Sequence, residues 1–113
     1  MNARRDDFQL VLTTAGSGEQ AETIARALVD RRLAACVNVM GGVCSFFRWE
    51  GKIQREDEKL LLIKSAKSLF PRVRETIREL HSYDVPEVLA IPIADGDPAY
   101  LKWLDGALDG GSD

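Results

Sequence analysis

The hydrophobic pattern of the chain alternates between stretches typical of strands and stretches typical of helices. A short β-rich run covers Phe8 to Thr14, and apolar residues then recur at helical spacing as far as Arg32. Ser17 stands three residues before Gln20, which is the spacing of a helix-capping box. The pattern therefore predicts a first strand followed directly by a first helix.

Two long apolar stretches follow, residues 35–49 and 52–65, and a Glu50-Gly51 dipeptide separates them. Glycine tolerates the positive φ that a tight hairpin turn requires, so the two stretches are predicted to be the arms of one β-hairpin. Each arm would be about 45 Å long, whereas a compact chain of this size is about 35 Å across. The hairpin is therefore expected to project from its own domain.

The projecting arms carry large apolar side chains that a monomer would leave in water. These are Val37, Val39, Val43, Phe46, Phe47, Trp49 and Ile53. An exposed apolar ribbon of this kind is prone to association. The simplest partner is another copy of the chain, so the pattern predicts a homo-oligomer.

The second half of the chain predicts two more helices and one more strand. Ser68 is a candidate N-cap, Pro71 is tolerated in the first helical turn, and the helix is expected to end at His81. Residues 88–93 are continuously apolar, which favours a buried fourth strand. An Asp-Pro pair then precedes a short third helix that ends near Leu108.

The resulting order, βαββαβ with a terminal helix, is the ferredoxin-like arrangement, an α+β fold with helices on one face of an antiparallel sheet. The other face would be bare in a monomer, which is a second reason to expect association through the sheet. We expect one domain over residues 8–108, an N-terminal tail over residues 1–7 and a loose C-terminal tail over residues 109–113.

Composition narrows the possible partners. The net charge is −3, and the 15 Lys and Arg residues are interspersed among 18 Asp and Glu, so there is no basic stripe for nucleic acid. No apolar run approaches the about 20 residues of a membrane span, and no secretory signal is visible. We expect a cytoplasmic protein with no nucleic-acid and no membrane partner.

The two cysteines are expected to remain reduced. On one regular strand, Cys36 and Cys44 would share a face, eight residues and about 26 Å apart, whereas a disulfide needs Cα atoms within about 7 Å. Reduced thiols fit a cytosolic protein.

Five motifs occur in a fixed order along the chain. They are residues 32–39 (RLAACVNV), 48–53 (RWEGKI), 62–64 (LIK), 80–87 (LHSYDVPE), and a closing set at 91–93, 96 and 100–104. Together they resemble the CutA family of divalent-cation tolerance proteins, from about residue 8 to residue 108. The resemblance implies a ferredoxin-like subunit in a tight homotrimer, assembled like the PII signalling proteins. It also implies a cytoplasmic role in heavy-metal tolerance, with copper as the expected metal.

Cys36 and His81 are the metal-ligand candidates, because thiolate and imidazole both suit copper and zinc. Two ligands are too few, so a site would need Asp, Glu or a second subunit. Only weak binding of copper or another divalent cation is expected, and no organic cofactor. The structural alternative makes Cys36 a small buried strand residue and His81 a helix end favoured by the helix dipole.

A second group consists of Trp49, Glu58, Lys64, Tyr83 and Glu87, which the resemblance implies lie near a cleft between neighbouring subunits. An aromatic wall, a lysine and carboxylates could hold a small anionic metabolite, which makes a PII-like sensor the alternative function. The structural alternative is an interface held by an aromatic anchor and ion pairs.

Catalysis is not expected. The chain has one His, no Gly-x-Ser-x-Gly elbow and no Walker loop. A small hydrolase that uses Cys36 with His81 is the second alternative, but a strand cysteine facing a core would react poorly.

Overall fold

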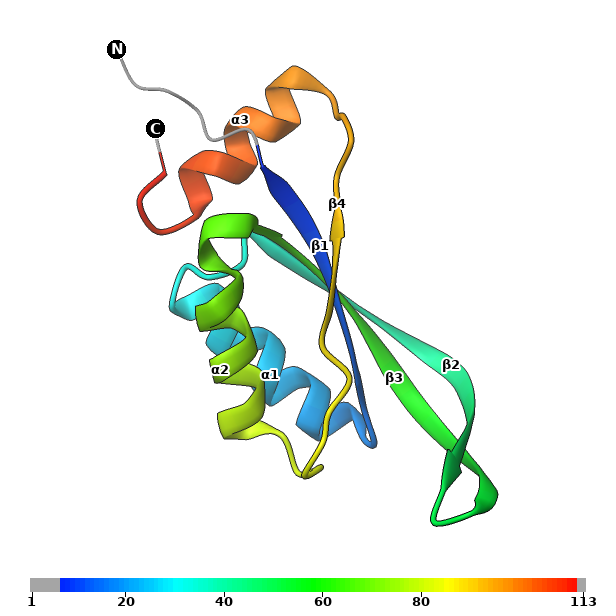
Figure 1. The fold of residues 1–113 in the computed structure, drawn as a ribbon. Coiled ribbons are helices and arrows are strands. Elements are labelled where there is room, and N and C mark those ends of the chain that lie inside the picture. The colour runs from blue at the N-terminus through cyan, green and yellow to red at the C-terminus, as the bar shows by residue number, and fades with distance from the viewer. Residues whose placement is uncertain (1–6, 112–113) are drawn as a thin grey trace.

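The chain folds in the predicted order of elements in the computed structural model, which describes residues 7–111 (Figure 1). The elements are β1 (Phe8–Ala15), α1 (Gly18–Asp30), β2 (Cys36–Trp49), β3 (Lys52–Ala66), a 3-10 turn (Lys67–Leu69), α2 (Phe70–Leu80), β4 (Leu89–Pro92) and α3 (Pro98–Ala107). The strands pair antiparallel in the order β2-β3-β1-β4. This order confirms the ferredoxin-like α+β fold. None of the helices described is long and apolar enough to cross a membrane.

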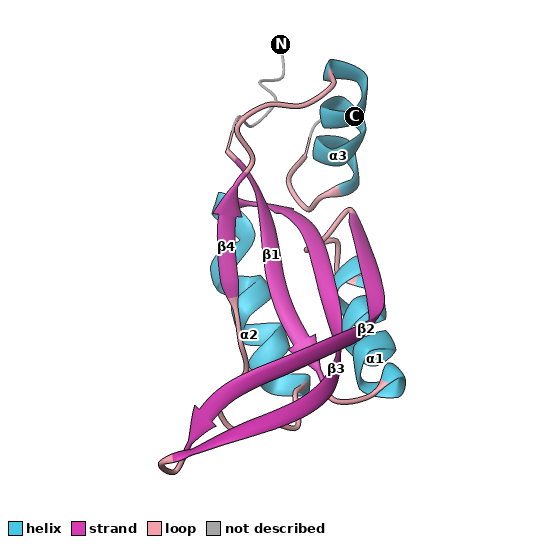
Figure 2. Ribbon diagram, turned by 90° about the vertical axis from the view of Figure 1, so that its right-hand side faces the viewer, coloured by secondary structure: helices cyan, strands magenta, loops and turns pink. Residues whose placement is uncertain are grey.

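The two longer helices cover one face of the sheet and leave the other open (Figure 2). Side chains alternate between the faces of a strand, so Leu61 and Ile63 of β3 point to the helices and are fully buried. The core residues that meet them from β1 and the helices are Val11, Ile24, Leu28, Val73, Ile77, Leu104 and Leu108. The even-numbered residues of β3 lie on the open face.

The starts of α1 and α3 follow the predicted signals, Asp97 being the N-cap of α3, and the start of α2 does not. The Ser17 side chain accepts a hydrogen bond from the backbone N–H of Gln20, at 3.1 Å, as predicted for α1. The assignment of Ser68 as the N-cap of α2 is wrong. Ser68 lies inside the 3-10 turn, and Leu69 occupies the N-cap without a side-chain hydrogen bond, because the chain enters α2 through that turn. Pro71 lies in the first turn of α2 as predicted.

The last strand differs from its prediction in both burial and position. We expected a buried strand, but β4 is a sheet edge that pairs only with β1, and all four of its residues are exposed. Leu89 and Ile91 pair with Leu12 and Leu10, so they point to the open face, where no helix covers them. The apolar residues of this strand therefore form part of an uncovered surface instead of the core.

The hairpin projects as predicted, and the molecule measures 55 × 25 × 22 Å (Figure 1). The last pair between β1 and β3 joins Ala15 to Lys59, so the rest of the hairpin extends beyond the body of the sheet. At its tip, Glu50 and Gly51 have φ values of 51° and 77°. Two consecutive positive φ angles are typical of a type I′ turn, which matches the twist of the strands.

A β-bulge interrupts β2 at the glycine pair. Met40 pairs with Leu60, and Val43 pairs with Glu58, so β2 has one residue more than β3 in this interval. Gly42 adopts φ 75°, which a β-branched residue would adopt only with strain. The extra residue exchanges the two faces of β2 beyond the bulge.

The bulge overturns the expectation that the two cysteines share one face. Cys36 pairs with Lys64 and Cys44 pairs with Asp57, so the side chains point to opposite sides of the sheet. Both thiols are free. The expectation that they do not form a disulfide is confirmed.

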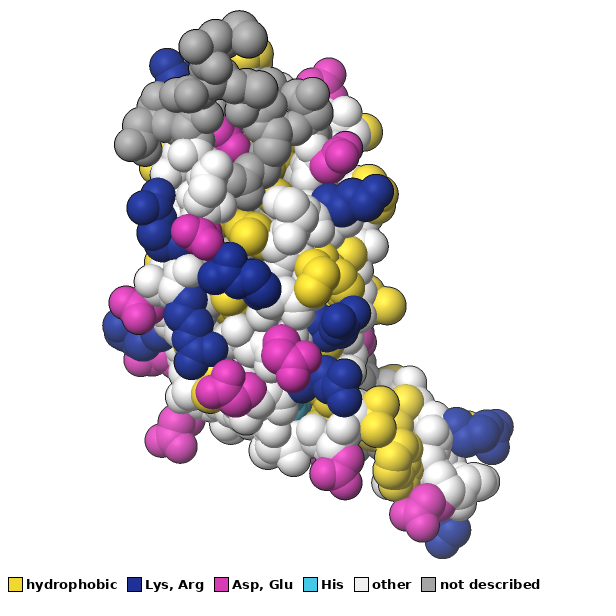
Figure 3. Space-filling view, turned by 60° about the vertical axis from the view of Figure 1, so that its left-hand side comes forward, with side chains coloured by type: hydrophobic (Ala, Val, Ile, Leu, Met, Phe, Trp, Pro, Cys, Tyr) yellow, Lys and Arg dark blue, Asp and Glu magenta, His cyan; other side chains and the backbone are white. Residues whose placement is uncertain are grey.

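The outer half of the hairpin exposes its large apolar side chains. Trp49 and Ile53 are 54% and 71% exposed, and Phe46 and Phe47 are also exposed. In Figure 3 charged side chains of both signs are interspersed over the helical side, while hydrophobic side chains gather on the projecting hairpin. The hairpin therefore has the surface of a contact region rather than of a solvated loop.

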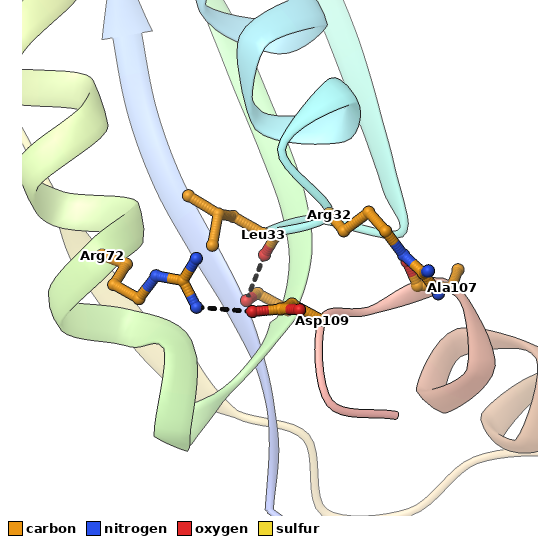
Figure 4. Close-up of polar contacts among 6 residues, drawn as sticks. Arg32, Leu33, Arg72, Ala107 and Asp109 are labelled. Carbon is orange, nitrogen blue, oxygen red and sulfur yellow. Dashed lines mark hydrogen bonds and ion pairs between the residues drawn. The ribbon is translucent and has the colours of Figure 1, made fainter. Parts of the chain in front are cut away.

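Asp109, just after α3, is bound to the body of the domain (Figure 4). The backbone N–H of Asp109 donates to the carbonyl of Arg32 at 2.8 Å, and Arg72 pairs with the Asp109 carboxylate at 2.8 Å. The Arg32 guanidinium donates to the carbonyls of Gly106 and Ala107. The expectation of a loose tail is wrong for Asp109, because Arg32 and Arg72, 37 or more residues away in the sequence, hold it.

The remainder of both expected tails, residues 1–6 and 112–113, lies outside the described residues. Asp7 is described, and its carbonyl accepts a hydrogen bond from the backbone N–H of Lys67 at 2.8 Å.

Candidate functional site

The seven side chains selected from the sequence lie in four places rather than in one site. His81, Tyr83 and Glu58 gather at the root of the hairpin, where it leaves the body. Cys36 and Lys64 pair across β2 and β3 nearer the opposite end of the sheet, Trp49 lies at the hairpin tip, and Glu87 is exposed in the loop before β4.

His81 is buried, and both of its ring nitrogens are engaged. Nε2 lies 2.6 Å from the carbonyl oxygen of Thr14, which can only accept, so Nε2 carries the proton. Nδ1 accepts the backbone N–H of Tyr83 at 3.0 Å. This hydrogen-bond network assigns a neutral imidazole with no free lone pair, so metal coordination would require His81 to break one of the two contacts.

Gln20 holds the chain on both sides of His81, a role that the sequence did not reveal. Its Nε2 donates to the carbonyl of Leu80 at 3.0 Å, and its Oε1 accepts the N–H of Ser82 at 2.8 Å. The sequence reading assigned Gln20 only to the cap of α1. Its side chain instead joins the start of α1 to the end of α2, and no local spacing signals a contact across 60 residues.

Tyr83 joins this loop to the hairpin. Its hydroxyl donates to Oε2 of Glu58 at 2.9 Å, and the rings of Tyr83 and His81 lie 4.6 Å apart. A Cβ at Gly16 would lie only 3.1 Å from that hydroxyl, so glycine leaves room for the contact. Burial first, then the hydrogen bond to Glu58, and then the charges of Glu58 and Glu56 raise the pKa of Tyr83 above 10.0.

Titration of Tyr83 tests this arrangement. The chain has two tyrosines, so Tyr100→Phe leaves Tyr83 as the only one. Near-ultraviolet absorbance should then give a tyrosinate midpoint above pH 10.0, the value expected for a free phenol. Adding Glu58→Gln should lower the midpoint but leave it above 10.0, because burial is the largest cause of the shift. A midpoint that is the same with and without Glu58→Gln would contradict the contact.

The same shift predicts how stability depends on pH. The folded state favours the protonated phenol, so this contribution is complete below pH 10.0 and is lost as the pH rises through the raised pKa of Tyr83. Tyr83→Phe should remove this loss, which denaturation at several alkaline pH values would measure.

Cys36 lies beside a lysine rather than beside a second metal ligand. The Lys64 ammonium donates to the Cys36 sulfur at 3.6 Å, and it also donates to the side-chain carbonyl of Asn38. The sequence placed Cys36 and Lys64 in different groups, and the strand register brings them together. A positive charge at the sulfur opposes the approach of a cation to this thiol.

The two metal-ligand candidates are far apart within one chain. Cys36 is level with Leu10 of β1, whereas His81 contacts Thr14, about 13 Å further along that strand at about 3.3 Å per residue. In addition, β3 lies between the strand that carries Cys36 and β1. Over residues 7–111, no three His, Cys, Asp or Glu side chains come together in a group that could hold a metal ion. The described part of one chain therefore does not fit a resident metal.

A hollow of about 300 Å³ lies beside this loop, between the start of α1 and Ser82. It is lined by Gly16, Ser17, Glu19, Gln20, Thr23 and Ser82. None of the seven selected residues lines it.

One helical layer on a four-stranded antiparallel sheet, with a hairpin that extends past the sheet, defines the class: a ferredoxin-like α+β domain with an elongated hairpin. Comparison with known families gives the membership within this class. Residues 9–107 match the family described as CutA1 divalent ion tolerance protein, and the chain belongs to that family.

The similarity extends to full-length relatives and to solved structures. The divalent-cation tolerance protein CutA of Thermus thermophilus is 49% identical over 96 residues, which are 85% of this chain and 93% of that protein. Protein CutA of the mouse is 46% identical over 84 residues, which are 74% of this chain and 48% of the mouse protein. The crystal structure of CutA1 from Oryza sativa superposes with a TM-score of 0.89 at 39% identity, covering 91% of this chain and 94% of that one. The chain thus spans nearly all of the bacterial relative and about half of the mouse protein.

Proposed function

We propose that the chain functions as a cytoplasmic homotrimer in divalent-cation tolerance, with copper as the metal concerned. Membership in the CutA1 family supports the tolerance function, and the Thermus thermophilus relative is named for it. The cytoplasmic assignment draws on the two free cysteines, which lie on opposite faces of the sheet.

One observation carries the proposed assembly. The hairpin and the open face of the sheet present large apolar side chains to water, including Met40, Phe47, Trp49, Leu89 and Ile91. Monomeric soluble proteins seldom expose a continuous apolar surface that extends over a sheet and a projecting ribbon. Copies of the same chain would cover this surface on every subunit at once.

The mass in solution tests the assembly directly. Light scattering across a dilution series should return three times the chain mass of 12.5 kDa. Folded, soluble protein with the mass of one chain would contradict the proposal.

The metal contact is proposed to be weak and to involve Cys36 more than His81. Cys36 is partly accessible, whereas the His81 nitrogens are both in hydrogen bonds. The proposal is one of binding rather than catalysis, since the only His of the chain is held by Thr14 and Tyr83, away from Cys36, and cannot act as its base.

Copper titration of single variants tests the ligands. Cys36→Ala should weaken copper binding by at least about tenfold, equivalent to a contact of about 1.4 kcal/mol. Cys44→Ala is the matched control, because it removes the other thiol, which lies on the opposite face. His81→Ala should have the smaller effect of the two candidate ligands. Unchanged affinity in both Cys36→Ala and His81→Ala would exclude these ligands.

A further inference from the structure

Glu58 is mostly buried and has no counter-charge among the described residues. The residue is 8% exposed, and its hydrogen-bond partner is the neutral hydroxyl of Tyr83, on Oε2. Within residues 7–111, no Lys or Arg forms an ion pair with Glu58. The ion pairs found there join Arg26 to Glu22, Arg31 to Glu79, Arg55 to Asp57 and Arg72 to Asp109. Acidic residues buried to this degree are usually paired, whereas water is all that Oε1 of Glu58 can meet in the single chain.

Any copy of the chain that covers the open face of the sheet would also cover Glu58. The strand register puts Met40, Phe47 and Trp49 on the same side of the sheet as Glu58, and all three are exposed. A subunit that covers these side chains would remove the water that remains around the carboxylate. Burial of an unpaired charge is strongly unfavourable, so the covering surface has to supply compensation.

The lysines on the same face of this chain are too far away to neutralise the charge of Glu58. Lys52 and Lys64 are each six residues from Glu58 along β3, which is about 20 Å at about 3.3 Å per residue. Lys64 is also held by Asn38 and Cys36.

We propose that Glu58 receives a Lys or Arg side chain from a neighbouring copy, so that the Glu58–Tyr83 site is complete only in the assembly. The inference rests on the proposed homotrimer and adds a specific ion pair between its subunits. Tyr83 occupies Oε2 and thereby orients the carboxylate, while Oε1 remains for the incoming donor.

The chemistry of the site favours a side-chain cation over the other ligands. A metal ion would need further ligands, and the described residues contain no group of three that could hold one. A small anion would be repelled by Glu58 and by the neighbouring Glu56, whose charges both act on Tyr83. A single ammonium or guanidinium needs only the one carboxylate.

Glu58→Gln tests the contact, because it keeps the shape and an oxygen to accept the Tyr83 hydroxyl while it removes the charge. Glu75→Gln is the matched control, with the same charge change at an exposed position of α2, on the side of the sheet that the helices cover. Light scattering over a dilution series should show the trimer of Glu58→Gln weakened by about 30-fold or more. The control should change by less than about threefold, as expected for an exposed charge.

A scan of the chain's Lys and Arg residues to Met identifies the partner. One such variant should weaken assembly as Glu58→Gln does, and the double variant should be little weaker than either single one, because both remove the same contact. This scan does not depend on the folding of Glu58→Gln, which circular dichroism checks. The wild-type trimer should also persist in a metal chelator.

The possible failures are distinguishable. Wild-type protein that is monomeric would overturn the proposed function and the inference together. A wild-type trimer that Glu58→Gln weakens no more than Glu75→Gln does, or a scan without any such cation, would overturn the inference alone. Dissociation of the wild-type trimer in chelator would overturn the inference, because it would mean that a metal ion holds the subunits together.

Discussion

Replacing Phe47 with aspartate is expected to split the proposed trimer into single chains. Phe47 is an exposed aromatic residue on the hairpin, on the same side of the sheet as Met40 and Trp49. The substitution removes an apolar contact and brings a charge into a surface that copies of the chain would cover. Loss of a central aromatic contact costs at least about 2 kcal/mol of binding free energy, or about 30-fold in affinity. The contact would be lost at every interface of the trimer.

Light scattering at several concentrations measures this effect, and circular dichroism reports whether the fold persists. Thr23→Asp is the control, because it adds the same charge at an exposed position of α1, on the side of the sheet opposite to the open face. Since assembly stabilises the folded chain by mass action, Phe47→Asp should also lower the unfolding temperature, while Thr23→Asp should change it little. A well-folded trimer of Phe47→Asp would show that the hairpin does not form the interface.

Leu104→Ala is expected to give the largest loss of stability from within a single subunit. Leu104 is 1% exposed and belongs to the cluster that attaches α3 to the core. Removal of a fully buried leucine side chain costs about 2–5 kcal/mol, because the surrounding residues only partly close the cavity. Denaturant unfolding, followed by circular dichroism at a fixed protein concentration, measures the loss.

Lys102→Ala is the control for Leu104→Ala. Lys102 lies two residues earlier on α3 and is exposed, and lysine and alanine both favour helices. Its free energy of unfolding should change by less than about 0.5 kcal/mol, as for most surface substitutions. Equal effects of the two variants would mean that α3 is not part of the folded core.

Much of the fold could be predicted because its signals are local. The helical spacing before Arg32, the Glu50-Gly51 turn and the apolar arms each lie within a short window, and each predicted the correct element. Two predictions that depended on neighbouring segments failed. Residues 89–92 are apolar enough for a buried strand, yet β4 has a partner on one side only, and the second helix starts at Phe70 after a turn that no sequence pattern indicated.

The candidate site was predicted in part. Glu58 and Tyr83 were assigned to one group, and their side chains are hydrogen-bonded at 2.9 Å. Lys64 was assigned to the same group but contacts Cys36, because the pairing of β2 with β3 places these two residues opposite each other. Gln20 was not selected, since its partners at the end of α2 are distant in the sequence.

The sequence by itself determined the order of the elements, the hairpin and its turn, since hydrophobic periodicity and backbone preference act between residues a few positions apart. Only the tertiary structure decided which face each side chain occupies beyond the bulge at Gly41 and Gly42, and which polar groups meet at the root of the hairpin. Those outcomes depend on strand register and on contacts between distant segments. One extra residue in β2 is enough to move every later side chain of that strand to the other face.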